Sequence, residues 1–239
     1  MLRWQDLFRP LVEEADGLQP GPLTRFLDTN TFYRAPVATR GRPAVRRPLD
    51  ARWLPPIEGP RVVTLPSPTA LARGTQLTPA EVAKGVLRPQ LDAVDAQLVV
   101  LAEPFLARDG EPQLDALADA LELLAGGPPL ALQLTFGSAR KALQRGLENL
   151  PVEGIGIDFY ATQARDVPLG FRRRLLAGVV DARSSALEEP DVVAAFVHRL
   201  GARGIANIDV VPNGDLQLVP EPIAREKLRR LAAARDHAR

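Results

Sequence analysis

The stretch QLVVLAEP, residues 97–104, decides the fold. Leu98 to Ala102 is an unbroken run of mostly branched apolar residues, which is typical of a β-strand buried on both faces. Pro104 has no backbone N–H to donate to a neighbouring strand, so the strand ends with Glu103 at its carboxyl end. Because parallel α/β proteins bind ligands at the carboxyl ends of their strands, this stretch predicts a carboxylate at a ligand-binding rim.

The same pattern recurs through the rest of the chain. Further apolar segments that are expected to be strands cover residues 61–65, 130–136, 153–159, 175–180 and 205–211, with helical stretches between them. This alternation predicts an α/β protein with a parallel sheet and helical crossovers. A closed eight-stranded (β/α) barrel takes about 250 residues. We therefore expect a TIM-type barrel that is complete only if residues 1–60 supply one or two more strands.

Local signals mark the ends of several helices. Thr78, Pro79 and Glu81 form a helix start, with a capping threonine, a proline in the first turn and a glutamate that closes the capping box. Ser138 is expected to cap a helix that runs to about residue 147. Near the amino terminus, Pro10 is expected to interrupt a short helix.

We expect one domain over residues 1–239, in which residues 1–60 are irregular and residues 61–239 alternate between strands and helices. Residues 38–60 are rich in proline, arginine and glycine. The arginines of this segment would suit an anion or an acidic partner, but we favour a solvated connector. They are Arg40, Arg42, Arg46, Arg47 and Arg52.

The composition excludes several classes of function. The chain carries 30 basic and 29 acidic residues, so its net charge favours neither nucleic acid nor a membrane surface as a partner. It contains no cysteine, which excludes disulfides, thiolate nucleophiles and zinc sites that need sulfur. The polar first turn and the lack of an apolar run of membrane-spanning length predict a soluble, cytoplasmic protein without a signal peptide.

Polar residues stand at or just beyond the carboxyl end of each predicted strand. They are Ser67, Glu103, Thr135, Asp158, Asp181 with Arg183, and Asn213. Each alone has a structural explanation as a helix cap, a turn former or a member of an ion pair, but together they favour a functional rim. The three carboxylates would bind a cationic amine and Arg183 would bind a carboxylate, as an amino-acid ligand requires. Acid–base catalysis stays open, because the sequence identifies no base with a tuned pKa.

Several segments, in order along the chain, resemble the amino-terminal half of the cobalamin-independent methionine synthase family. LTRFLDTNTFYRAP (23–36) is similar to an aromatic-Asx-Thr-Asn-aromatic-x-Tyr pattern of that half, and it resembles archaeal stand-alone forms more closely still. RVVTLPSPTALARG (61–74) resembles a strand followed by a Gly-Pro-x-Thr-type loop, and LVVLAEPFLA (98–107) an Asp-Glu-Pro-Ala strand end with Ala102 in place of the aspartate. LLAGVVDARSSALEEPD (175–191) resembles a Gly-Val-x-Asx-x-Arg segment, and IDVVPNGDLQLVPEPIAREKL (208–228) the closing strand and helix.

The resemblance implies a (β/α) barrel and methyl transfer from a folate, or in archaeal forms a corrinoid, to the thiol of homocysteine. The family's catalytic half holds zinc through a His-x-Cys strand end, a following acid and a cysteine in a closing turn. The matching places here are Gln133 and Thr135, Asp158, and Gly214. Only the acid is kept and both sulfur ligands are lost. We therefore predict no metal and no tightly bound cofactor.

These implications predict a zinc-less subunit that works with a separately encoded, zinc-containing catalytic domain. Glu103, Asp158 and Asp181 are the candidate catalytic residues. The candidate substrate-binding residues are Asn30, Tyr33, Ser67, Thr135, Arg183 and Asn213, of which Asn30 and Tyr33, with the connector arginines, would face the methyl donor's polyglutamate or the partner. Two alternatives are a barrel that binds an amino acid or a pterin without catalysis, and an independent enzyme that uses Glu103 and Asp158 as acid and base.

Overall fold

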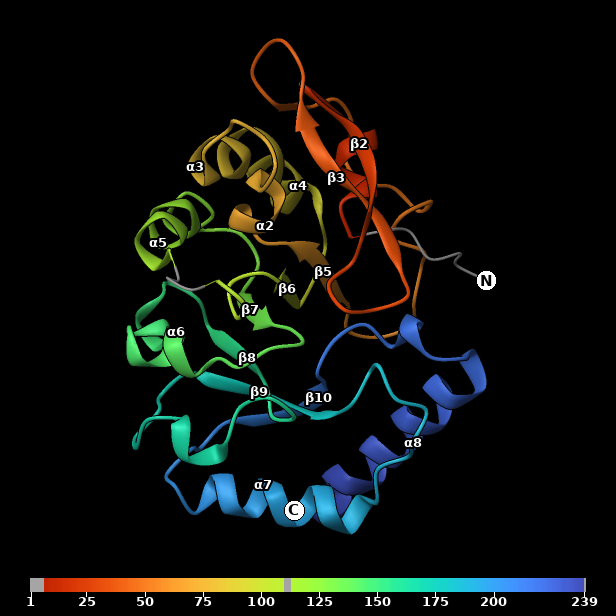
Figure 1. The fold of residues 1–239 in the computed structure, drawn as a ribbon, viewed down its shortest axis with the longest axis vertical. Coiled ribbons are helices and arrows are strands. Elements are labelled where there is room, and N and C mark those ends of the chain that lie inside the picture. The colour runs from red at the N-terminus through yellow and green to blue at the C-terminus, as the bar shows by residue number, and fades with distance from the viewer. Residues whose placement is uncertain (1–6, 110–112, 239) are drawn as a thin grey trace. The chain divides into compact units, whose positions relative to one another are not determined.

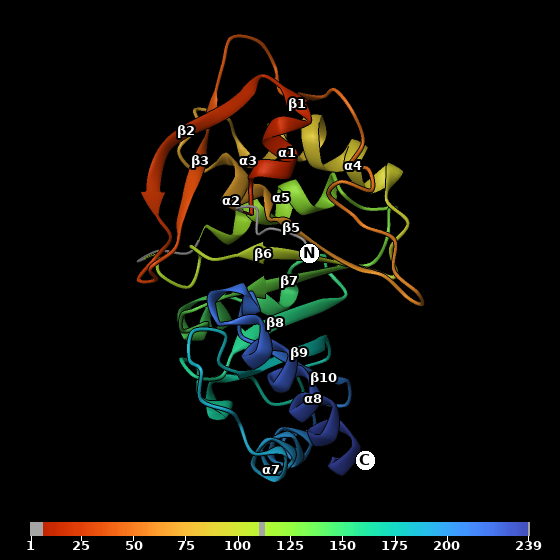
Figure 2. The ribbon, with the colours of Figure 1, turned by 90° about the vertical axis from the view of Figure 1, so that its right-hand side faces the viewer.

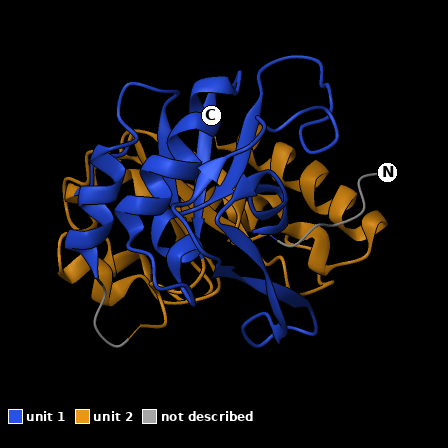
Figure 3. Ribbon diagram, turned by 90° about the horizontal axis from the view of Figure 1, so that it is seen from above, with its two compact units in different colours: residues 1–103, 113–132, 150–152 blue, residues 104–112, 133–149, 153–239 orange. Residues whose placement is uncertain are grey.

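The structure is a computed structural model that describes residues 7–109 and 113–238. Within these ranges the chain forms two compact units, which Figure 3 colours separately. Unit 1 takes residues 1–103, 113–132 and 150–152, and unit 2 takes residues 104–112, 133–149 and 153–239. No helix within the described ranges is long and apolar enough to cross a membrane.

The six strands predicted from apolar runs are present, with bounds shifted by a few residues. They are β5 (Val62–Pro66), β6 (Leu98–Glu103), β7 (Leu130–Leu134), β8 (Gly154–Asp158), β9 (Arg174–Val180) and β10 (Ile208–Pro212), in the sheet order β10-β9-β8-β7-β6-β5. In unit 1, β5 pairs in parallel with β6, and in unit 2, β9 pairs in parallel with β8 and β10. These pairings confirm the predicted parallel strands. Strands β6 and β8 are buried along their whole length, as expected for unbroken apolar runs.

Short helices of unit 1 pack beside β5 and β6 (Figure 1). They are α2 (Pro68–Ala72), α3 (Pro79–Val82), a π-helical turn (Ala83–Leu87), α4 (Arg88–Ala93) and α5 (Leu114–Glu122). The predicted capping box is confirmed, since Glu81 N donates to Thr78 Oγ1 at 3.2 Å and Thr78 N donates to Glu81 Oε2 at 2.7 Å. Pro89 lies in the first turn of α4, directly after the π-helical turn, and has no N–H for the helical hydrogen bond at that position.

The helices of unit 2 are α6 (Arg140–Gln144), α7 (Pro190–Gly201) and α8 (Glu221–His237), with 3₁₀ turns at Leu147–Asn149, Ala164–Asp166 and Leu216–Leu218. Helices α7 and α8 lie side by side (Figures 1 and 2). The expected helix from Ser138 to residue 147 is wrong in extent. Gly146 takes a φ of 85°, a conformation that ends a helix, and no side chain caps the amino end of α6.

The first sixty residues form α1 (Arg9–Glu13), β1 (Ala15–Asp16), β2 (Leu18–Arg25), β3 (Phe32–Ala38) and β4 (Ala44–Val45). Strand β1 pairs with β4, and β2 pairs with β3 as an antiparallel ribbon (Figure 1). Among the described residues these strands do not join the parallel sheet, so the condition set for a complete barrel, one or two more strands from residues 1–60, is not met there. Pro20, Pro22 and Pro36 lie in the ribbon, and prolines cannot donate to the ladder of a central strand. Pro10 begins α1 rather than interrupting it.

The buried carboxylate of Glu14 binds residues 38–60 to the rest of unit 1 through hydrogen bonds. Glu14 is 1 % exposed, and it accepts hydrogen bonds from Arg47 Nε at 2.9 Å, from Trp53 Nε1 at 3.0 Å and from Arg52. The Arg52 guanidinium lies 4.5 Å from the centre of the Trp53 ring. Buried Gln90 donates to the carbonyl of Arg47 at 2.9 Å. Two arginines of the predicted solvated connector therefore have a structural role.

Candidate functional site

In unit 1, the carboxylate at the end of β6 is held by two hydroxyl groups. Glu103 is 1 % exposed, and its Oε2 accepts hydrogen bonds from Ser67 Oγ and Thr69 Oγ1. Ser67 is also the N-cap of α2, where its Oγ accepts from Ala70 N at 3.0 Å. The structure thus brings together two of the predicted site residues, Ser67 and Glu103. Thr69 was missed, although a hydroxyl two residues beyond the strand-end serine was a usable signal.

In unit 2, Asp158 ends β8 and is fully buried. Its Oδ1 accepts hydrogen bonds from Tyr160 N at 2.9 Å and Asn213 Nδ2 at 3.1 Å. Its Oδ2 is buried and has no hydrogen-bond partner among the described residues. Burial raises the pKa of Asp158, and the hydrogen bonds from Asn213 and Tyr160 only partly oppose that shift. Asp158 therefore keeps its proton to a higher pH than an exposed aspartate does.

Asn213 joins the ends of three strands of unit 2. Its Nδ2 donates to Asp158 and also lies 3.4 Å from Asp181 Oδ1, while its Oδ1 accepts from Ala182 N at 2.9 Å. Its own backbone N donates to the carbonyl of Val180 at 2.9 Å. Because a buried amide satisfied in this way is costly to replace, Asn213 fixes the relative positions of the two aspartates.

Arg183 completes this cluster. Its backbone N donates to Asp181 Oδ1 at 3.0 Å, and its Nε lies 3.7 Å from the same oxygen. The centre of its guanidinium lies 4.9 Å from the centre of the Phe136 ring, within cation–π range. The sequence did not identify Phe136, which is buried and has a positive φ of 54°. We call Asp158, Asp181, Arg183 and Asn213, with Phe136, the unit 2 cluster.

A second set of contacts supports the loop that carries Asp181. Lys227 on α8 is fully buried, and its Nζ donates to Glu188 Oε2 at 2.9 Å and Oε1 at 3.0 Å. Glu188 Oε1 also accepts from the Tyr160 hydroxyl and from Asp181 N, each at 2.9 Å. Burial acts to raise the pKa of Glu188, but the bonds from Lys227, Asp181 and Tyr160 outweigh it, so that pKa lies below its usual value. The only sequence signal was a lysine in a chain whose bases are nearly all arginine.

The remaining predicted residues, which belong neither to the contacts of Glu103 nor to the unit 2 cluster, are Thr135, Asn30 and Tyr33. Thr135 is buried directly after β7, one residue before Phe136. Asn30 is exposed in the turn of the β2–β3 ribbon, where its Oδ1 accepts from Arg25 Nη2 at 3.3 Å. The Tyr33 ring is buried between Phe8 and Phe26, with ring centres 5.5 and 5.6 Å away. A binding role for these three residues stays a prediction.

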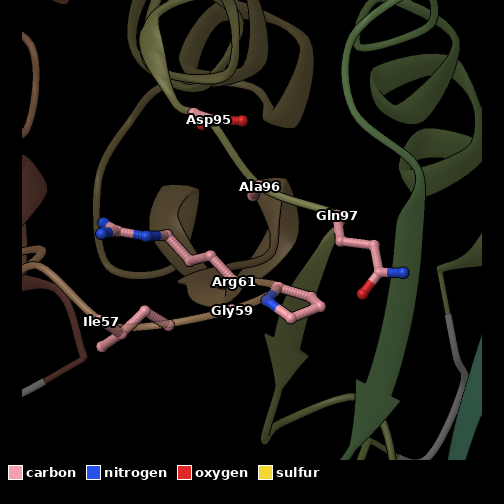
Figure 4. A pocket seen from close by; sticks show the side chains of 7 residues that line it. Ile57, Gly59, Arg61, Asp95, Ala96 and Gln97 are labelled. Atoms are coloured by element: carbon pink, nitrogen blue, oxygen red, sulfur yellow. The ribbon is translucent and has the colours of Figure 1, made fainter.

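A separate groove lies at the amino-terminal ends of β5 and β6 (Figure 4). It has a volume of about 330 Å³ and is lined by Ile57, Gly59, Pro60, Arg61, Asp95, Ala96 and Gln97. The Arg61 guanidinium donates to the carbonyls of Leu54 and Pro55 at 3.3 and 3.2 Å. The groove lies at the opposite strand ends from Ser67 and Glu103, so it is distinct from the predicted rim.

Parallel strands with helical crossovers, and acidic side chains buried at their carboxyl ends, define an α/β protein of the strand–helix repeating class. The sequence model of the family described as cobalamin-independent synthase, N-terminal domain, matches residues 75–203. This match covers more than half of the chain, so the chain belongs to that family. The resemblance inferred from the sequence is therefore confirmed at the family level.

Several solved structures have a fold similar to that of this chain. A B12-independent methionine synthase from Shewanella sp. W3-18-1, solved in complex with selenomethionine, has a TM-score of 0.74 at 17 % identity and covers 94 % of this chain and 76 % of its own. The putative vitamin-B12 independent methionine synthase from Listeria monocytogenes has a TM-score of 0.63 at 11 % identity over 95 % and 76 %. A methyltransferase from Methanosarcina mazei has 0.56 at 17 % identity over 95 % and 77 %. At these identities the likeness shows the fold alone. No curated protein matches the chain.

Proposed function

We propose that the chain is a zinc-less methionine-synthase-type subunit that supports methyl transfer to homocysteine together with a separately encoded, zinc-containing catalytic domain. Membership of the cobalamin-independent synthase family over residues 75–203 carries this proposal. A methyl-folate, or a methyl-corrinoid, would be the donor. Cytoplasmic location belongs to the same proposal. Because the chain contains no cysteine, it offers no thiolate ligand for a zinc ion that would activate the homocysteine thiol, so the proposal assigns that step to the partner.

The proposal includes a single domain built on a (β/α) barrel. Its support is the run of parallel strands joined by helices and the TM-score of 0.74 with the Shewanella enzyme. In such a barrel the carboxyl ends of the strands carry the ligand site. In unit 1, Glu103 ends β6, and in unit 2, Asp158 ends β8 and Asn213 directly follows β10, so each unit carries polar residues at the carboxyl ends of its strands.

The unit 2 cluster suits an amino-acid ligand of the homocysteine class. Arg183, whose side chain is about one-third exposed, offers a guanidinium that would pair with the ligand carboxylate. Asp181 offers oxygens for the ligand amine, and the neighbouring Asp158 Oδ2 is buried and has no partner among the described residues. An ammonium group beside Asp158 would lower the pKa of that carboxyl again, since an opposite charge favours the ionised form.

The test mixes the purified chain with the zinc-containing catalytic domain encoded in the same genome. We expect a complex in analytical ultracentrifugation, and faster methyl transfer from 5-methyltetrahydrofolate triglutamate to homocysteine than the catalytic domain shows alone. As a matched control, Arg183→Met should keep the complex and lose the gain in rate. No complex and no gain in rate would refute the proposal.

A second candidate is a binding barrel for an amino acid or a pterin that works without catalysis. The observation that favours it is the buried Asp158 Oδ2, which lacks a partner among the described residues and lies in the same cluster as Arg183. Thermal-shift measurements with homocysteine, methionine and folates separate the two candidates. Stabilisation by a ligand that does not depend on the partner, with no effect on methyl transfer, supports the binding protein.

A further inference from the structure

A buried lysine on α8 contacts the segment that follows the unit 2 cluster in the chain. The side chain of Lys227 is 0 % exposed. Burial of an ammonium group is costly unless each of its three N–H groups has an acceptor. The Nζ of Lys227 has three acceptors, which are Glu188 Oε2 at 2.9 Å, Glu188 Oε1 at 3.0 Å and the carbonyl oxygen of Ala186. Lys227 therefore fixes both the position and the charge of the Glu188 carboxylate.

A second residue of α8 holds the same segment. Arg230 Nη1 donates to Glu189 Oε1 at 2.8 Å and to the backbone carbonyl of Glu188 at 3.3 Å. Residues three apart in a helix lie on the same face, so Lys227 and Arg230 face the segment together. One face of α8 thus binds residues 186–189 through both backbone and side-chain oxygens.

Glu188 connects this segment to the unit 2 cluster. Its Oε1 accepts hydrogen bonds from Asp181 N and from the Tyr160 hydroxyl, each at 2.9 Å. Asp181 Oδ1 in turn accepts from Arg183 N at 3.0 Å. A hydrogen bond to an ionised acceptor is stronger than one between neutral groups. The charge that Lys227 maintains on Glu188 therefore strengthens the hold on the backbone of Asp181.

We infer that Lys227 is a positioning residue of the unit 2 cluster, which holds Asp181 and Arg183 in place through the carboxylate of Glu188. Without the ammonium group, Glu188 would keep a partly buried charge that has lost its cationic partner. The carboxylate would then take up a proton or turn towards water, and its bond to the Asp181 amide would weaken. This positioning is a property of the unliganded chain. Only its consequence for an amino-acid ligand rests on the proposed function.

The first arm of the test measures amide hydrogen exchange by NMR in the unliganded chain. In Lys227→Met, we expect the Asp181 N–H to exchange about tenfold faster relative to the amides of β9. The matched control is Leu231→Ala, which removes a buried side chain of the same helix and leaves Glu188 and its partners in place. It should lower overall stability without changing that ratio. Because Lys227→Met can fail to fold, Glu188→Gln is a second variant, which keeps the side-chain size, loses the charge and should also raise the ratio.

The second arm measures the Kd of L-methionine by isothermal titration calorimetry. We expect binding about tenfold weaker in Lys227→Met and unchanged in Leu231→Ala. An unchanged exchange ratio for Asp181 in folded Lys227→Met or Glu188→Gln would overturn the inference, and so would a raised ratio with an unchanged Kd. If the wild-type chain binds no methionine, the proposed amino-acid ligand is refuted, and the exchange ratio alone decides whether Lys227 positions the cluster.

Discussion

At the scale of single residues, Asp158 makes stability depend on pH in an unusual direction. Its folded-state pKa is raised by burial, so between the unfolded and folded pKa values the folded chain binds more protons than the unfolded chain. The contribution of Asp158 to stability is therefore largest below the unfolded pKa and is lost as pH rises through the folded pKa. Urea unfolding of wild type and Asp158→Asn at several pH values tests this. We expect the stability of wild type relative to Asp158→Asn to fall from pH 4 to pH 7.5, and a constant difference would contradict it.

Glu188, which forms an ion pair with Lys227, makes stability depend on pH with the opposite sign. Lys227→Met would leave Glu188, whose side chain is 13 % exposed, without its cationic partner, and removing one member of a buried ion pair costs about 3–5 kcal/mol. The pKa of Glu188 is lowered in the folded state, so this stabilisation is present above the unfolded pKa and is lost as pH falls through the folded pKa. The penalty of Lys227→Met, measured by urea unfolding, should therefore shrink in acid.

The matched control for that pair is Lys84→Met, because Lys84 is exposed on the π-helical turn. Its effect should stay within about 0.5 kcal/mol, as is usual for surface substitutions. A penalty below about 1 kcal/mol for Lys227→Met at neutral pH would mean that the pair behaves as a surface ion pair. The loop that presents Asp181 would then owe its position to other contacts.

At the scale of elements, Ser67 and Ser138 differ in whether the side chain caps a helix. Ser67 caps α2 and donates to buried Glu103, so Ser67→Ala removes a cap and also leaves the carboxylate one donor short. We expect a loss of about 2 kcal/mol in the free energy of unfolding. Ser138 is exposed and makes only a 3.3 Å contact with Arg140 N, so Ser138→Ala should cost less than about 0.5 kcal/mol. Chemical denaturation of both variants decides the point, and equal costs would refute it.

These elements also show what the sequence could predict. The parallel strands and the capping box at Thr78 were predictable, because unbroken apolar runs and capping residues act over a few neighbouring positions. The pairing of the first four strands was not, since short strands carry little register information of their own. The end of α6 was misjudged because Gly146 was not recognised as a helix terminator.

At the scale of the whole molecule, the identity of the strand-end residues was predictable, but their contacts depend on positions far apart in sequence. Asp158 and Asn213 lie 55 residues apart and meet in one hydrogen bond, as expected for the ends of parallel strands. The left-handed backbone of Phe136 was not predictable, because a positive φ is rare for a bulky residue and has no local sequence signal here. The burial of Lys227 was also missed, because its partner Glu188 lies 39 residues away in the sequence.

Ligand binding by the whole chain is the last property that the unit 2 cluster predicts. If Arg183 holds a carboxylate and the aspartates hold an amine, L-methionine should stabilise the chain, whereas L-methioninol, which lacks the carboxylate, should do so far less. A ligand at a hundredfold excess over its Kd stabilises by about 2.7 kcal/mol, which corresponds to a rise in melting temperature of about 5–10 °C. Arg183→Met should abolish the difference between the two probes, while Arg145→Met, an exposed arginine at the end of α6, should preserve it. Equal stabilisation by both probes in the wild-type chain would remove Arg183 from the site and leave the acidic side chains to account for binding.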